Sequence, residues 1–197
     1  MNKKYDIMIL SGGFDPVHEG HVAMFEHAAK LAHEVIVGLN SDAWLTRKKG
    51  KPFMKFESRL IVVSSMRAVD LATKFNDDDG TACDLISSIY KEYCDEYNHL
   101  KLRIAFGNGG DRSGKDKIPT AEAIMCEKLG IEMVWGVGGE EKANSSSWLI
   151  KNATDNCKNE EERKAVNKTI SDALVNRNQN NEEFHRTVGV IVSDKQD

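Results

Sequence analysis

Residues 5–27 read YDIMILSGGFDPVHEGHVAMFEH, and this stretch decides the fold. The apolar run from Ile7 to Leu10 is typical of a buried strand, and the serine and glycines that follow it end that strand in a turn. After Glu19, apolar residues recur at helical spacing. The stretch therefore predicts a strand, a glycine turn and a helix in direct succession.

Two histidines, His18 and His21, lie three positions apart where this helix begins. Residues at that spacing share one side of a helical turn, so both imidazoles can face one ligand. A helix start also presents unpaired backbone N–H groups, and Gly12 and Gly13 allow an anion to approach the backbone. Because the turn has neither a P-loop ending nor a G-x-G-x-x-G pattern, it predicts a phosphate site of a different kind.

The histidine pair has two less specific interpretations. The imidazoles could be helix-capping and surface polar groups, or they could form half of a metal site with Asp15, since histidine is a common metal ligand. The glycines, the position at a helix start and the motifs further along the chain favour the phosphate site.

Composition limits the class of protein. The chain has 197 residues, 40% hydrophobic and 29% charged, as expected for one globular domain with an appendage. A net charge of −4 with interspersed signs argues against a nucleic-acid partner. The four cysteines form no C-x-x-C pair, and no apolar run is long enough for a signal segment or a membrane span. We therefore expect a cytoplasmic protein without a membrane partner.

Strand and helix patterns alternate along the rest of the chain. Further strands are predicted at 34–39, 69–75, 102–106 and 131–135, and helices at 56–68, 81–97 and 121–129. The basic segment 46–52 and the acidic segment 76–80 are predicted to be solvated loops, and the latter lacks the ligand spacing of an EF-hand. The alternation predicts an α/β fold, a Rossmann-like doubly wound parallel sheet of about five strands.

The composition changes near residue 155. We expect the α/β domain to span 1–154 and a C-terminal helical extension to span 155–197, with a helix near 166–174 and a possible strand at 187–192. The extension could cover a sheet edge, make a subunit contact or form a lid.

Four segments follow predicted strands and should meet at one edge of the sheet, where ligands bind in open parallel sheets. They are Gly12–His21, Asn40–Lys51, Gly107–Arg112 and Gly138–Ser147. The serines in the last of them fall at a helix start, where they can cap the helix and surround a phosphate with donors.

The segment Phe14 to His21, Phe-Asp-Pro-Val-His-Glu-Gly-His, resembles the H-x-G-H signature of the cytidylyltransferase-like nucleotidyltransferase superfamily. The resemblance covers residues 5–154. Within the superfamily, the segments 38–43, 46–52, 57–59 and 68–70 resemble the branch that contains heptose 1-phosphate adenylyltransferase and glycerol-3-phosphate cytidylyltransferase. Segment 109–111 also matches the former.

The resemblance implies that a phosphate oxygen of an acceptor attacks the α-phosphorus of a nucleoside triphosphate and that pyrophosphate leaves. The catalytic residues would be His18, His21 and Lys48, which stabilise charge on the triphosphate. The nucleotide would contact Gly12, Gly13, Phe14, His18, Gly20, His21, Gly109, Asp111, Ser145, Ser146 and Ser147. The acceptor, a small sugar or polyol phosphate, would contact Asp15, Arg59 and Arg112.

The resemblance also implies that Mg²⁺ accompanies the triphosphate, without an assigned protein ligand, and that the chain could be a homodimer. Three positions depart from the family pattern. Gly13 replaces a hydroxyl or thiol residue, and Arg112 replaces an aromatic residue. Glu140 stands where cytidylyltransferases carry an arginine, and a carboxylate cannot donate to cytosine, so ATP is favoured over CTP.

Three alternatives stay open. The chain could use CTP, as glycerol-3-phosphate cytidylyltransferase does. It could be a nucleotide-binding module without turnover. It could also be a metal-dependent hydrolase that uses Asp15, His18 and His21.

Overall fold

The computed structural model describes residues 2–96, 101–109, 120–139, 146–156, 160–161, 164–165 and 168. The chain divides into two units, Met1–Leu149 and Ile150–Asp197. The residues described in the second unit are helical, while the predicted strand at 187–192 lies outside the described residues. The domain boundary after residue 154 stays a prediction.

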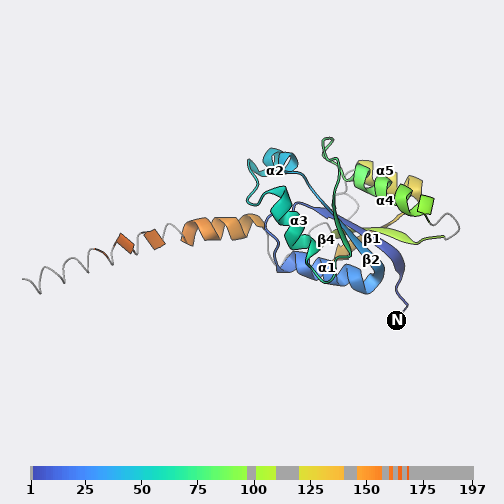
Figure 1. Cartoon of the computed structure of the whole chain (residues 1–197), viewed down its shortest axis with the longest axis horizontal. Helices are drawn as coiled ribbons and strands as arrows, with labels where there is room; N and C mark the ends of the chain where they lie inside the picture. The colour runs from blue at the N-terminus through green and yellow to red at the C-terminus, as the bar shows by residue number, and fades with distance from the viewer. Residues whose placement is uncertain are drawn as a thin grey trace, which may run out of the picture. The chain divides into compact units, whose positions relative to one another are not determined.

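The first unit alternates strands and helices (Figure 1). The elements are β1 Tyr5–Gly12, α1 Glu19–Leu31, β2 Ala32–Leu39, α2 Asp42–Lys49, α3 Phe56–Ser64, β3 Leu71–Lys74, α4 Cys83–Glu96, β4 Ile104–Gly109, α5 Thr120–Leu129 and β5 Glu132–Val137. All neighbouring strands are parallel, and the five-stranded sheet has the order β3-β2-β1-β4-β5. The predicted doubly wound α/β fold is confirmed.

Alternation along β1 divides the core into two layers. Met8 and Leu10 belong to the cluster that includes residues of α1 and α3, while Ile7 and Ile9 belong to the cluster that includes residues of α4 and α5. Because side chains alternate across a strand, β1 is covered on both faces and must be apolar at successive positions. This burial explains the continuous apolar run in the sequence.

The basic segment 46–52 is not wholly a loop, because α2 extends through Lys49. The Ser41 hydroxyl caps the helix by accepting the Trp44 N–H at 3.0 Å, and Gly50 ends it with φ of 89°. The last four residues of α2, Thr46 to Lys49, are all polar, so this part of the helix has no apolar periodicity. The loop prediction was wrong there because capping and tertiary packing, rather than an apolar stripe, define this helix.

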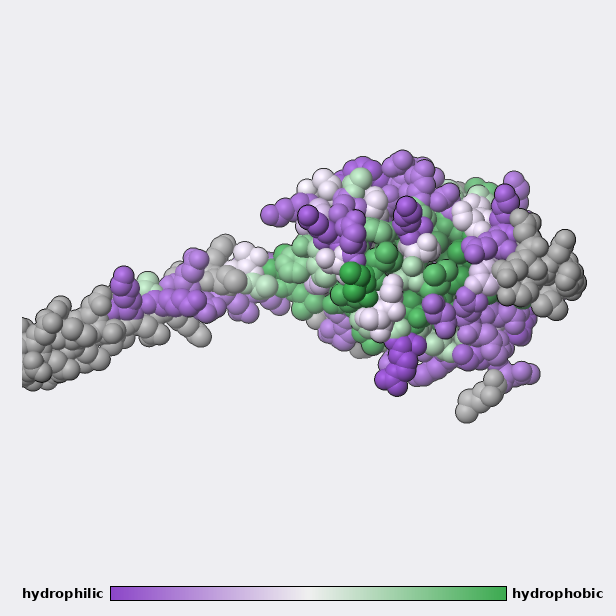
Figure 2. Space-filling model, in the orientation of Figure 1, coloured by the Kyte–Doolittle hydropathy of each residue, from purple (hydrophilic) through white to green (hydrophobic). Residues whose placement is uncertain are grey.

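The surface of the first unit is mostly hydrophilic, with apolar residues gathered near the centre of the face in Figure 2. Phe53 and Ile61 are among the large apolar side chains that are exposed. A subunit contact would cover such an area, but the homodimer stays a prediction. Among the described residues, no helix has the length and apolar character needed to cross a membrane.

Candidate active site

The turn from β1 to α1 is built on a buried aromatic ring. Phe14 has φ of 48° and is 2% exposed, and its ring lies edge-on to His21 with centroids 5.0 Å apart. It also contacts Phe25 of α1. The side chain of Phe14, a residue predicted to contact the nucleotide, is therefore part of the core.

The two histidines cap α1 with their own rings. His18 is the N-cap residue, and its Nδ1 accepts the N–H of Gly20 at 3.2 Å. His21 Nδ1 accepts the N–H of His18 at 3.4 Å, and the two rings stack with centroids 3.8 Å apart. The capping interpretation and the shared-side prediction are both correct. The expectation of unpaired N–H groups is wrong for Gly20 and His18, because both N–H groups donate to imidazole nitrogens.

This capping decides which imidazole nitrogen carries the proton. A nitrogen that accepts a hydrogen bond is unprotonated, so each neutral ring carries its proton on Nε2. The pKa of His21 is lowered from 6.5 to about 3, mainly by burial and in addition by the nearby His18 and Lys49. His21 is therefore neutral in ordinary buffers and presents Nε2–H as a donor.

Lys49, rather than Lys48, is the lysine bound to the histidine turn. Lys49 Nζ donates to the backbone oxygen of Asp15 at 3.1 Å, and burial lowers its pKa despite the opposing influence of Asp15. Lys48 Nζ instead lies 4.4 Å from the centroid of the Trp44 ring. The two lysines point in different directions because consecutive residues are about 100° apart around the helix axis. Residues 44 and 48 are four apart, so they lie on the same side of the helix.

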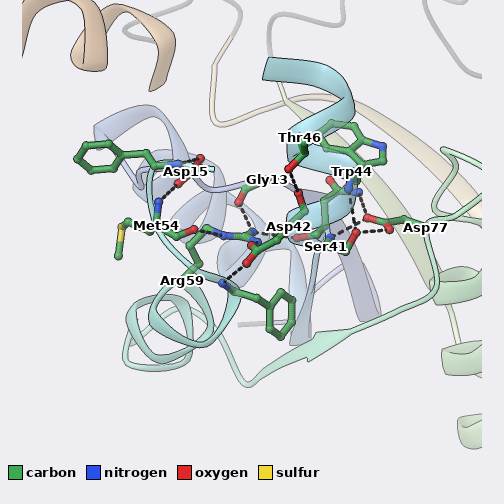
Figure 3. Close-up of polar contacts among 12 residues, drawn as sticks. Gly13, Asp15, Ser41, Asp42, Trp44, Thr46, Met54, Arg59 and Asp77 are labelled. Carbon is green, nitrogen blue, oxygen red and sulfur yellow. Dashed lines mark hydrogen bonds and ion pairs between the residues drawn. The ribbon is translucent and has the colours of Figure 1, made fainter. Parts of the chain in front are cut away.

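The carboxylate of Asp15, predicted to contact the acceptor, bonds to the backbone of this protein. Its side chain is fully buried, and its carboxylate accepts the N–H groups of Phe53 at 2.8 Å and Met54 at 2.7 Å (Figure 3). These bonds clamp the segment between α2 and α3 onto the histidine turn. Among the described residues, no group of three or more His, Cys, Asp or Glu side chains could hold a metal ion, so the Asp15 metal site gains no support.

Arg59, the other predicted acceptor contact, is also internal. Its guanidinium is fully buried and donates to the backbone oxygens of Gly13 at 2.7 Å and Asn40 at 2.9 Å (Figure 3). It also forms an ion pair with Asp42 at 2.7 Å. Arg59 therefore joins the end of β1, the end of β2 and the first turn of α2, so it is a positioning residue.

Asp77 was missed by the sequence analysis. It lies in the acidic segment predicted to be solvated, yet it is 2% exposed and accepts from the Ser41 N–H at 2.7 Å and the Ser41 hydroxyl at 2.6 Å. Asn40 Nδ2 also donates to it at 3.1 Å. Its neighbours Asp78 and Asp79 are exposed as predicted. Nothing in the local sequence distinguishes the buried acid from the other two.

Side chains pack closely against two glycines of the histidine turn. A Cβ at Gly12 would lie 2.9 Å from the Phe14 ring, and one at Gly13 would lie 2.8 Å from Leu45 Cδ2. Real Cβ atoms essentially never show such distances. A side chain at either position would have to displace the Phe14 ring or the end of the Leu45 side chain.

Of the three predicted phosphate-binding serines, the structure describes two. The Ser146 hydroxyl is nearly buried and donates to the backbone oxygen of Pro16 at 2.9 Å, while Ser147 is exposed. Ser146 thus joins the segment 138–147 to the histidine turn, and these two segments were predicted to meet at one edge of the sheet. Its hydroxyl bonds to the protein backbone rather than to a ligand. Gly109 ends β4, and the predicted site residues Asp111, Arg112 and Ser145 lie outside the described residues.

The strand order places the histidine turn next to the point where the order of the sheet reverses. The chain runs from β1 outward to β3 and then returns to β4, so the order reverses between β1 and β4. Ligands of doubly wound sheets bind at this switch point, outside the carboxyl ends of the strands. The fold and site define a Rossmann-like α/β protein with a histidine-capped turn at its switch point.

Comparison with known proteins identifies the family. The chain belongs to the cytidylyltransferase-like family, whose match covers residues 9–111. "Bifunctional protein HldE" of Photorhabdus laumondii is 32% identical over 138 residues, covering 69% of this chain and 24% of that protein. The protein of the same name from Hahella chejuensis is 39% identical over 74 residues, covering 36% of this chain and 16% of that protein. The chain therefore spans a quarter or less of the length of these relatives.

One similar solved structure is a lipopolysaccharide core biosynthesis protein from Thermoplasma volcanium. It is 25% identical, with a TM-score of 0.45, and the similarity covers 67% of this chain and 94% of that one.

Proposed function

We propose that this protein transfers a nucleotidyl group from a nucleoside triphosphate to a small phosphorylated acceptor and releases pyrophosphate. The observation that carries the proposal is the pair of stacked imidazoles whose Nδ1 atoms cap α1, next to the Lys49 ammonium. Family membership supports the same reaction class.

In the proposed reaction an acceptor phosphate oxygen forms a bond to the α-phosphorus, and the bond from that phosphorus to the pyrophosphate oxygen breaks. Negative charge then increases on the leaving pyrophosphate. His18 and His21 donate hydrogen bonds to it through Nε2–H, and Lys49 supplies a positive charge. Donors that are already oriented cost little reorganisation as the charge develops, which is the main advantage of such a site.

Lys49 is our choice for the cation because it contacts the turn that carries the histidines. Its charge also influences the pKa of His21, which requires the two groups to be close. The sequence alone assigned this role to Lys48. Lys48 is one row away on α2, with its ammonium over the Trp44 ring.

Mg²⁺ is proposed to enter with the nucleotide and to neutralise the triphosphate oxygens. The carboxylates of Asp15 and Asp42 already bond to the loop and to Arg59. We therefore assign no protein ligand to the metal, and phosphate oxygens and water would hold it.

We propose ATP as the nucleotide and a sugar or polyol phosphate as the acceptor. Support comes from the resemblance of the segments 38–43 and 109–111 to heptose 1-phosphate adenylyltransferase, and from the acidic Glu140. A cytoplasmic location agrees with Cys83, Cys94 and Cys126, which are free thiols.

The test is a pyrophosphate-release assay with Mg²⁺, in which ATP and CTP are each combined with glycerol 3-phosphate and a panel of aldose 1-phosphates. We expect release that requires both substrates and is faster with ATP. Release that is independent of acceptor would indicate hydrolysis. Turnover with CTP alone would overturn the nucleotide assignment, and tight nucleotide binding without turnover for any acceptor would favour the binding-module alternative.

A further inference from the structure

The side chain of Asp77 holds the start of α2. The residue is nearly buried, and its carboxylate accepts hydrogen bonds from the Ser41 N–H at 2.7 Å, the Ser41 hydroxyl at 2.6 Å and Asn40 Nδ2 at 3.1 Å. The Ser41 hydroxyl in turn accepts the N–H of Trp44 as the N-cap of the helix. Figure 3 shows Asp77 beside Ser41 at the start of α2. One buried carboxylate therefore fixes the N-cap of α2 and the residue before it.

The backbone of the same residue holds the other end of α2. Arg47, in the last turn of the helix, donates through Nη2 to the backbone oxygen of Asp77 at 2.8 Å. Asp77 thus contacts the helix twice, with its side chain at the start and with its carbonyl near the end. Because two contacts at separate points fix the direction of a helix, Asp77 sets the tilt of α2.

The turn that carries Asp77 is itself tied to the fold. The Gly80 N–H donates to the backbone oxygen of Asp77 at 3.0 Å, which closes the turn. The N–H of Asn76 donates at 2.8 Å to Asp84, in the first turn of α4. The turn is therefore anchored between β3 and α4, so it is a fixed point against which α2 can be held.

The far end of α2 carries the cation of the proposed site. Lys49 is the last residue of this helix, and its Nζ donates to the backbone oxygen of Asp15 at 3.1 Å. With 8 residues at about 1.5 Å each, α2 is about 12 Å long, so a tilt of about 5° at its start moves Lys49 by about 1 Å. A displacement of that size can cost about 10²-fold in rate. The contribution of Lys49 therefore depends on how α2 is held.

We propose that Asp77 is a positioning residue that places the Lys49 ammonium at the histidine turn. It touches no substrate and acts through α2, whose two ends it holds. This inference rests on the proposed function, in which Lys49 supplies a positive charge to the leaving pyrophosphate.

The substitution Asp77→Asn removes this support with almost no change in side-chain size. Three donor hydrogens from Asn40 and Ser41 converge on the carboxylate. An amide offers one oxygen, and its NH₂ group would face some of these donors instead of accepting from them. The variant should therefore loosen the start of α2.

The first test is a double-mutant cycle on kcat in the pyrophosphate-release assay. Asp77→Asn should lower kcat between about tenfold and about 10²-fold. In a Lys49→Ala background the same substitution should lower kcat by less than about twofold, because the group through which Asp77 acts is gone. Asp78→Asn, at an exposed neighbouring position, is the matched control and should change kcat by less than about twofold. Equal losses in both backgrounds would mean that Asp77 does not act through Lys49, which overturns the proposal.

The second test measures the position of Lys49 without turnover. The lysines are ¹³C-methylated, and the pKa of Lys49 is read from the pH dependence of its NMR signal, which is assigned by its absence in Lys49→Arg. Burial lowers this pKa in the wild type. Release of Lys49 into water would raise the pKa toward its ordinary value, whereas loss of the Asp77 charge alone would lower it further. We therefore expect the Lys49 pKa to rise in Asp77→Asn and not in Asp78→Asn.

The second test also separates this inference from the reaction itself. A raised Lys49 pKa in Asp77→Asn supports the positioning role even if no acceptor gives turnover. An unchanged or lowered pKa overturns it even if the protein is an active nucleotidyltransferase. If Asp77→Asn does not fold, Ser41→Ala takes its place in both tests, because it removes one donor to Asp77 and the N-cap without changing the charge. The same rise in the Lys49 pKa is expected, and its absence in Ser41→Ala would overturn the proposal.

Discussion

His21 accepts the backbone N–H of His18 through Nδ1, and the two imidazole rings stack with centroids 3.8 Å apart. The same atoms that cap the helix therefore fix the orientation of the groups proposed to bind phosphate. Capping uses Nδ1 of each ring and the proposed phosphate contact uses Nε2, so substitutions can separate the two roles.

Replacing His18 by Asn should separate capping from phosphate binding. Asparagine is a preferred N-cap, so His18→Asn should keep the unfolding free energy, whereas His18→Ala should lower it by about 1 kcal/mol. Both variants lose the Nε2–H donor, so turnover should fall by about 10²-fold in each. Urea unfolding and pyrophosphate release measure the two effects. If His18→Asn retains wild-type turnover, the imidazole is only a cap.

Replacing the three lysines of α2 and the following loop one at a time should identify the catalytic cation. Lys49→Ala should lower kcat by about 10²-fold, because the cation beside the histidine turn is lost. Lys48→Ala and Lys51→Ala should lower kcat much less than Lys49→Ala does. A larger loss of kcat in Lys48→Ala than in Lys49→Ala would return the catalytic role to Lys48, as the sequence alone suggested.

Replacing Arg59 should affect stability more than acceptor binding. Arg59→Met leaves the Asp42 carboxylate and the carbonyls of Gly13 and Asn40 without their buried donor, so the unfolding free energy should fall by about 3–5 kcal/mol. Arg67→Met, at an exposed position nearby in the sequence, is the control and should change it by less than about 0.5 kcal/mol. A fully stable Arg59→Met protein with a raised acceptor KM would instead make Arg59 a substrate contact.

The low pKa of His21 predicts how stability depends on pH. The folded protein keeps this ring neutral down to about pH 3, whereas the ring in the unfolded chain takes up a proton near pH 6.5. Unfolding therefore binds a proton between these values. The contribution of His21 to the unfolding free energy is therefore fully present above about pH 6.5. As the pH falls toward 3, the unfolding free energy decreases by up to about 1.4 kcal/mol per pH unit.

Urea unfolding of the wild type and of His21→Gln at a series of pH values tests whether the contribution of His21 to stability decreases as the pH falls. The stability advantage of the wild type over the variant should shrink as the pH is lowered. A difference that does not vary with pH would mean that His21 is not kept neutral by the fold.

Much of the fold follows from local patterns. The apolar run at Ile7–Leu10, the glycines after it and the helical spacing after Glu19 predict β1, the turn and α1, because buried strands, turns and amphipathic helices have their own residue periodicities. The same reasoning predicts the parallel sheet and the position of His18 and His21 at its carboxyl edge. These features depend on neighbours a few positions away, which a single sequence shows.

Tertiary structure alone decided which polar side chains face the site. Asp15 bonds to Phe53 and Met54, which are 38 and 39 positions away, and Arg59 bonds to Gly13 at a separation of 46. No local pattern contains such pairings, because they arise when separate strands end at one edge of the sheet. Lys48 and Lys49 are equivalent in sequence, and Asp77 resembles its acidic neighbours. Only the packing of α2 and of the segment after β3 shows which of them is bound to the turn and which is buried.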